Sequence, residues 1–145
     1  AALARAHRSG GGLGPYALQA AIAACHARAT TAEQTDWETI AALYGALSRV
    51  SPSPIVELNR AVAVSMASGP AAGLKLVDSL VSEPVLANYH LLPSVRGDLL
   101  AKLGRHEEAR IEFERAAGMT RNAREREFLM ERSRSSARDP ALPSG

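Results

Sequence analysis

Apolar side chains recur every three to four residues along most of the chain, which is the spacing of amphipathic α-helices. Between residues 36 and 50, for example, the apolar positions include Trp37, Ile40, Tyr44 and Leu47. Runs of β-branched residues are nearly absent, which argues against a sheet protein. The pattern therefore predicts an all-α fold.

Turn-forming and capping residues divide this pattern into separate helices. Thr35 and Glu38 fit a capping box at the start of one helix. Ser53 followed by Pro54 fits the cap and first turn of the next. We predict helices over residues 15–29, 36–50, 54–67, 70–81, 90–104 and 106–117, and a charged helix that begins near residue 121.

The two ends of the chain differ from this helical region. Residues 1–14 finish in a Ser- and Gly-rich stretch, the composition of a flexible linker, and residues 135–145 are expected to form a disordered tail. Residues 15–134 are expected to form one helical domain, long enough to bury a core. Aromatic residues make up only 4% of the chain, against 28 Ala and 17 Leu, so this core must consist of small aliphatic side chains.

A shift of 36 residues aligns two consecutive helical pairs. Aligned positions keep their size class, small where two helices cross and larger where a side chain fills a gap. The aligned pairs are Ala61 with Gly97, Val64 with Leu100, Ser68 with Gly104, Gly73 with Ala109, Val77 with Phe113, and Leu80 with Ala116. An earlier unit aligns less well.

The later unit resembles the tetratricopeptide (TPR) repeat in its spacing, Gly97-x2-Leu100-x3-Gly104-x4-Ala109-x3-Phe113-x2-Ala116. The resemblance implies TPR-like helical hairpin repeats, about three hairpins in a right-handed α-solenoid, with the last helix as a C-terminal cap. Short loops between helices also fit a generic antiparallel helical bundle, which is the alternative.

The charge of the chain is nearly balanced. Lys and Arg number 17 against 15 Asp and Glu, a formal net charge of +2. The most charged segment, residues 105–138, holds nine Arg against seven Glu. Because nucleic-acid binding needs clustered, uncompensated cations, we expect no direct nucleic-acid binding by this chain.

Residue types that carry catalysis or bind metals are sparse. The single cysteine, Cys25, excludes an internal disulfide and a multi-cysteine zinc site. None of the four His has the partner four residues away that a helical zinc site needs. We therefore expect no enzymatic activity, no metal and no cofactor. No apolar stretch approaches about 18 residues and no signal-peptide pattern is visible, so we expect a cytoplasmic location and no membrane partner.

What remains is a surface for another protein. In TPR-like hairpins the first helix of each unit lines the concave side, and the predicted register places polar residues there among apolar Leu58, Val62 and Val95. The candidate protein-binding residues are Gln19, His26, Asn59, Asp98 and Lys102, with Tyr89 and His90 at the entrance of the third hairpin. Asn59 is the strongest candidate because asparagine is a poor helix former in mid-helix. The alternative is that all seven are ordinary solvated or capping residues.

Four segments, in this order, resemble the C-terminal extension of one bacterial protein family. They are GPYALQAAIAA (14–24), TDWETIAALY (35–44), SPIVELNRAVA (53–63) and YHLL (89–92). The family is the extracytoplasmic-function (ECF) group of RNA polymerase sigma factors that carry a TPR-like C-terminal region. The similarity covers about residues 14–132.

The resemblance implies a regulatory protein-interaction domain that modulates transcription initiation. Its partners would be the sigma-factor core regions, RNA polymerase or a regulatory protein. The family's promoter-binding regions lie upstream of this extension, and neither is visible here, so this chain is expected to lack promoter binding. The alternative is a free-standing TPR-like peptide-binding scaffold unrelated to transcription.

Overall fold

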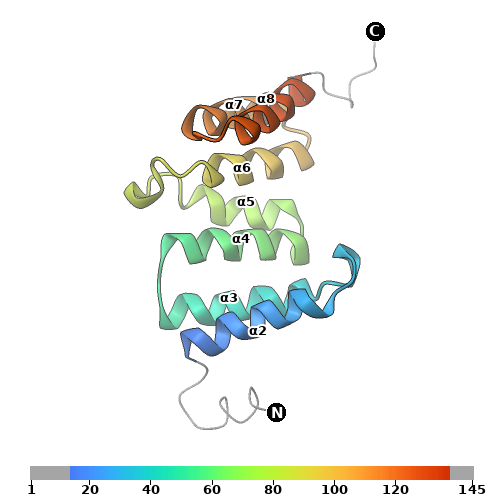
Figure 1. Ribbon diagram of the computed structural model, residues 1–145, viewed down its shortest axis with the longest axis vertical. Coiled ribbons are helices and arrows are strands. Elements are labelled where there is room, and N and C mark those ends of the chain that lie inside the picture. Colours follow the sequence, from blue (N-terminus) through green and yellow to red (C-terminus); the bar gives the residue numbers. More distant parts are fainter. Residues whose placement is uncertain (1–13, 138–145) are drawn as a thin grey trace.

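The computed structural model describes residues 14–137, and this part of the chain is all-helical, without a strand (Figure 1). Two short 3-10 turns, η1 (Ala32–Gln34) and η2 (Pro84–Leu86), interrupt the series of α-helices. The helices are α2 (Pro15–Arg28), α3 (Trp37–Val50), α4 (Pro54–Ser68), α5 (Pro70–Asp78), α6 (Leu91–Lys102), α7 (His106–Met119) and α8 (Ala123–Ala137). The all-α prediction is confirmed. Nearly all of the expected linker, and residues 138–145 of the expected tail, lie outside the described residues.

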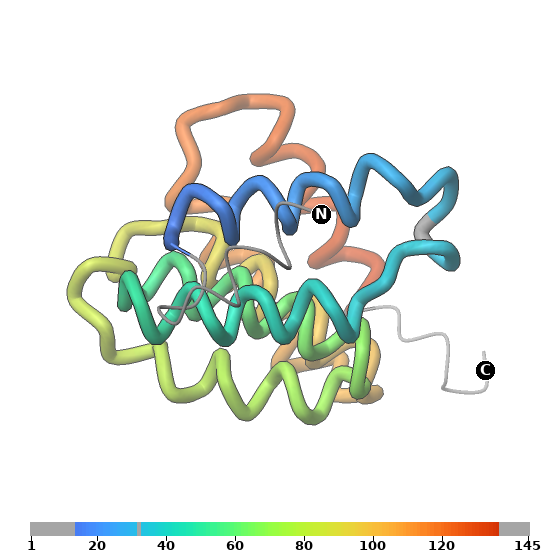
Figure 2. Tube along the Cα trace, turned by 90° about the horizontal axis from the view of Figure 1, so that it is seen from below, coloured from blue at the N-terminus to red at the C-terminus, as the bar shows by residue number. Residues whose placement is uncertain are grey.

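Each helix packs mainly against its neighbours in the sequence. Figure 1 shows the consequence: α2 and α3 lie at one end of an elongated stack, and α7 and α8 lie at the other. Viewed from below, along the stack, the axes of α2, α3 and α5 run in roughly the same direction in Figure 2. A smaller contact joins α4 to α6, which are not consecutive.

Two apolar clusters hold the stack together, and α4 contributes to both. The first cluster lies among α2, α3 and α4 and includes Ile22, Ile40 and Ala63. The second extends from α4 to α8 and includes Ala61 and Phe113. Ala61 and Ala63 are both fully buried. Successive residues of a helix are rotated by about 100° around its axis, so residues two positions apart are rotated by about 200°. Ala61 and Ala63 therefore point to nearly opposite sides of α4, one into each cluster.

Small residues allow two pairs of helices to approach closely. A Cβ atom added at Gly73 would lie 2.4 Å from the Cβ of Ser65 and 2.9 Å from the carbonyl oxygen of Ala61, so α5 rests directly on the backbone of α4. A Cβ atom added at Gly97 would lie 2.9 Å from the ring of Phe113. The prediction that Gly97 and Ala109 sit at tightly packed positions agrees with their burial.

The capping box predicted at Thr35 and Glu38 is wrong by one residue. The N-cap of α3 is Asp36, whose carboxylate accepts a hydrogen bond from the Thr39 backbone N–H at 3.1 Å. The Thr39 hydroxyl donates to the same carboxylate at 2.7 Å, while the Thr35 hydroxyl donates to the Thr31 carbonyl at 3.3 Å. The Asp36 carboxylate therefore caps the helix, one residue after the Thr35 hydroxyl that was expected to do so. The cap predicted at Ser53 is confirmed, since its side chain accepts from the Ile55 N–H.

Helix ends depart most from the predictions at two places. Helix α5 ends at Asp78 rather than residue 81, because the Ser79 hydroxyl donates to the Leu76 carbonyl at 2.6 Å and the backbone tightens into a turn. Helix α8 continues to Ala137, three residues into the expected tail. Ser133 and Ser136 of that last stretch are buried, so packing on the neighbouring helix extends α8.

Within residues 14–137, no helix has both the length and the apolar character needed to cross a bilayer.

The close approach at Gly73 generates a matched pair of predictions. Gly73→Ala should lower the free energy of unfolding by about 1–3 kcal/mol, because α4 and α5 must move apart to admit the methyl group. Gly45→Ala, in the interior of α3, should raise it by about 0.5–1 kcal/mol, because the nearest atom is a flexible Arg60 side chain 3.8 Å away and alanine is the better helix former. Urea unfolding of both variants tests the pair; equal effects would contradict the contact between α4 and α5.

Candidate functional site

An open pocket of about 230 Å³ lies among three helices that are not consecutive in sequence. We call it the α4–α6–α8 pocket. Helices α4 and α6 supply most of the lining, and α8 supplies a single arginine. Its lining residues are Val62, Ser65, Met66, Ser94, Val95, Asp98, Leu99, Lys102 and Arg132.

The walls of the pocket are mainly apolar. Val62 and Val95 have branched side chains with few accessible rotamers, and Leu99 beneath them is only 2% exposed. The Ser65 hydroxyl donates to the Val62 carbonyl of its own helix at 2.7 Å, so its single donor is already used. Met66 lies at the edge, is 43% exposed and has a flexible side chain. Such walls suit an apolar group.

One side of the pocket carries charge. The Asp98 carboxylate accepts a hydrogen bond from the Arg132 guanidinium at 2.8 Å and lies 3.0 Å from the Lys102 ammonium. The Arg132 guanidinium also lies over the Phe113 ring, 4.7 Å from its centroid, and 6.0 Å from the centroid of Phe128. Two cations therefore surround one anion, and this side has one unit of positive charge in excess.

This arrangement favours the ionised form of Asp98. Burial disfavours the charged carboxylate, but the hydrogen bonds from Arg132 and Lys102 outweigh that cost. As a result the pKa of Asp98 lies below its ordinary value of 3.8.

Three of the seven candidate residues lie in or beside this pocket. Asp98 and Lys102 line it. Asn59 is exposed on α4, three residues before Val62 and seven before Met66, so it lies on the same helical stripe. Of the three apolar residues expected among these candidates, Val62 and Val95 line the pocket, whereas Leu58 is buried in the second cluster.

The remaining four candidates lie elsewhere. Tyr89 packs against the second apolar cluster, and His90 forms an ion-pair contact with Glu125 that joins the start of α6 to α8. Gln19 and His26 are exposed on α2, outside the pocket lining, and the His26 ring meets the edge of the Trp37 ring at 5.5 Å. The structure does not bring these four to the pocket.

Sequence reasoning missed Arg132, the residue that connects α8 to the pocket. Its nearest sequence signal is Phe128, four residues earlier on the same helical face. That spacing predicts a contact between the two, but not the contact with Asp98, which is 34 positions earlier in the chain.

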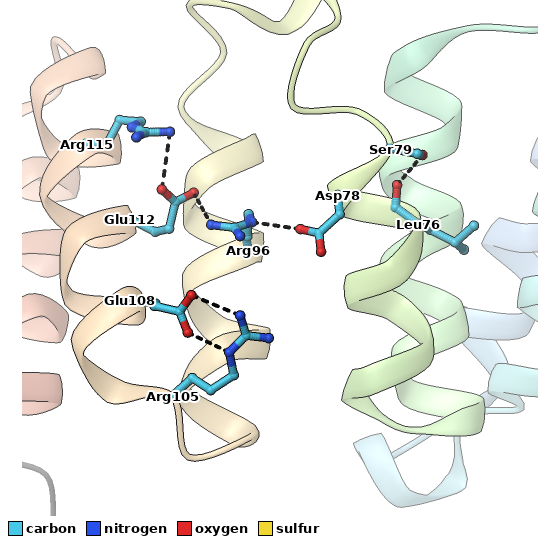
Figure 3. Close-up of polar contacts among 8 residues, drawn as sticks. All are labelled: Leu76, Asp78, Ser79, Arg96, Arg105, Glu108, Glu112 and Arg115. Carbon is cyan, nitrogen blue, oxygen red and sulfur yellow. Dashed lines mark hydrogen bonds and ion pairs between the residues drawn. The ribbon is translucent and has the colours of Figure 1, made fainter.

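A row of charged side chains also links α5, α6 and α7 (Figure 3). Glu112 of α7 is only 3% exposed, and its oxygens lie 3.5 Å from Arg96 and 3.3 Å from Arg115. Arg96 reaches across to Asp78 of α5 at 2.9 Å. Burial disfavours the charge on Arg96, but Asp78 and Glu112 outweigh it and the pKa of Arg96 lies above its ordinary range. This row joins three helices and is not an open ligand site.

No group of three or more His, Cys, Asp or Glu side chains within residues 14–137 has the geometry to hold a metal ion.

No family model matches the sequence. An uncharacterized protein of Rhizobium meliloti (strain 1021) is 50% identical over 128 residues, which is 88% of this chain and 30% of that protein. The chain therefore spans less than a third of the length of this relative.

Glu112 gives a prediction about stability. Glu112→Ala should lower the free energy of unfolding by about 1–3 kcal/mol, because it removes a buried carboxylate that faces two guanidinium groups. Glu114→Ala is the matched control on the same helix: Glu114 is exposed and pairs with Arg110 at 2.8 Å, so its loss should cost less than about 1 kcal/mol. Thermal or urea unfolding measures both variants. Equal losses of unfolding free energy would contradict the prediction that the buried Glu112 contributes more to stability than the exposed Glu114.

Asp98 gives a prediction about pH. A carboxyl group whose pKa is lower in the folded than in the unfolded chain stabilises the fold above its unfolded pKa, and this stabilisation is lost as pH falls through the folded value. The stability gap between wild type and Asp98→Asn should be largest near about pH 6 and shrink below about pH 4. Urea unfolding across this range measures the gap. A gap that stays constant would contradict the contacts of Asp98 with Arg132 and Lys102.

Proposed function

We propose that this chain is a regulatory protein-interaction domain from the C-terminal part of an ECF sigma factor, where it modulates transcription initiation by RNA polymerase. The observation that carries the proposal is the α4–α6–α8 pocket, an open site with apolar walls and a charged side. Clefts of this character recognise protein segments through a few anchoring side chains. The family assignment rests on the resemblance of the four sequence segments given above.

The TPR-like arrangement belongs to this proposal and draws support from burial. In four of the six pairs related by 36 residues, both members are buried: Ala61 and Gly97, Gly73 and Ala109, Val77 and Phe113, Leu80 and Ala116. The packing of each helix mainly on its neighbours in the sequence is what stacked hairpins require. In the right-handed stack that we propose, α4, α6 and α8 share one face, and residues of all three helices line the pocket.

The length of the relative supports a role within a longer polypeptide. A segment that makes up 30% of another protein fits one region among several, as the sigma-factor proposal requires. A free-standing peptide-binding scaffold remains the competing function. The coding sequence upstream and in frame separates the two, because the sigma-factor proposal requires promoter-binding regions in the same polypeptide.

The proposal predicts a loss of transcription in the polypeptide that carries this domain. Removing residues 15–137 should lower transcription from the cognate promoter. Asn59→Ala should lower it in the same direction but less, while keeping or raising stability, because alanine is the better helix former. Lys75→Ala, an exposed change on α5 outside the pocket lining, is the control and should leave transcription unchanged.

Reporter output and protein level should be measured together. Normal output after removal of the domain would overturn the proposal. Normal reporter output from Asn59→Ala alone, at a normal protein level, would mean that Asn59 is not part of the contact surface and that this surface consists of the pocket residues.

A further inference from the structure

The size of the α4–α6–α8 pocket limits what it can hold. Its volume of about 230 Å³ falls below the range of about 300–1,000 Å³ that is typical of small-molecule and cofactor sites. The pocket therefore suits one side chain of a larger partner better than a complete small ligand. Because the lining of the pocket is mainly apolar and includes Val62 and Val95, that side chain is apolar.

The charged side of the pocket decides what lies next to this anchor. Asp98 neutralises only one of the two cations that surround it. The Lys102 side chain is about half exposed, and an ammonium group has three donors, so Lys102 can bind a second carboxylate while keeping its contact with Asp98. Arg132 is held by Asp98 and by the Phe113 ring, so it supplies a fixed positive charge beside Asp98.

We propose that the α4–α6–α8 pocket binds a peptide segment in which an apolar side chain is followed directly by acidic residues. The apolar side chain enters between Val62 and Val95, and the acidic residues meet Lys102 and Arg132. This inference rests on the proposed function, since it names the partner's chemistry at the site of that function. A single excess charge suits a short acidic segment, whereas a nucleic-acid backbone requires several uncompensated cations.

Blocked peptides test the proposal on the 145-residue chain, with NMR chemical shifts of the ¹⁵N-labelled protein as the readout. The probe is acetyl-Gly-Ser-Leu-Asp-Glu-Ser-Gly-amide. One comparison peptide replaces Asp-Glu by Lys-Lys, a second replaces Leu by Ser, and a third carries Leu at a free C-terminal carboxylate in place of the acidic pair. We expect the probe to shift the amides of Val62, Val95 and Lys102, and to bind at least about fivefold more tightly than each comparison peptide.

Two lysine variants provide the matched test of charge. Lys102→Glu should weaken binding of the probe by at least about fivefold, and raising the salt concentration should weaken binding to the wild type. Lys75→Glu makes the same change on exposed α5 and should leave binding unchanged. Both lysines are exposed, so neither variant is expected to unfold, and the amide spectrum verifies this directly.

Several outcomes would overturn the inference. These are tighter binding of the Lys-Lys peptide, equal binding of the Ser peptide, preference for the free carboxylate, shifts confined to residues outside the pocket, or no shift at millimolar peptide. Equal weakening of probe binding in Lys102→Glu and Lys75→Glu would also overturn the inference, because the effect would then come from the overall charge of the protein. If the probe does not bind as expected while removal of residues 15–137 still lowers transcription, this inference is wrong and the proposed function is supported. If the probe binds as expected while that removal has no effect on transcription, the proposed function is wrong and the binding specificity of the pocket is supported.

Discussion

The rest of the structure depends on α4 having two buried sides. Ala61 and Ala63 are two positions apart and face different apolar clusters, so α4 joins the α2–α3 end of the stack to the α5–α8 end (Figure 1). Only small side chains permit this, because Gly73 brings α5 against the α4 backbone at Ala61. A helix buried on two sides retains a narrow exposed stripe, and Asn59, Val62 and Met66 lie on that stripe.

The pocket follows from this packing. Helices α4 and α6 have only a minor contact, because α5 lies between them in the order of packing. The small side chains of Ser65 and Ser94 do not fill the space that remains. Helix α8 closes one side through Arg132, whose bond to Asp98 at 2.8 Å connects residues 34 positions apart. The same packing order that builds an elongated stack thus leaves a groove lined by alternate helices.

The two groups of charged residues have different roles for a physical reason. In the row from Asp78 to Arg115, anions and cations balance, and the central Glu112 is buried. Such a row stabilises the contacts of α5, α6 and α7 but offers no excess charge to a partner. At Asp98 the cations outnumber the anion and Lys102 is exposed. The second group is the one that can act on another molecule.

The sequence by itself determined the helical class, most helix positions and the small residues at close contacts, because 3.6-residue periodicity, Pro and Gly positions and residue size are local properties. Ser53 as a cap and the burial of Gly97 and Ala109 followed from it, as did Val62, Val95, Asp98 and Lys102 as neighbours of one surface. The tertiary structure decided where α8 ends and that Gln19 and His26 lie away from the pocket, whereas the Asp36 cap of α3 is a local contact that the capping-box prediction placed one residue too early. It also supplied Arg132, since contacts between α6 and α8 depend on how intervening helices stack, and no spacing along the chain encodes that geometry.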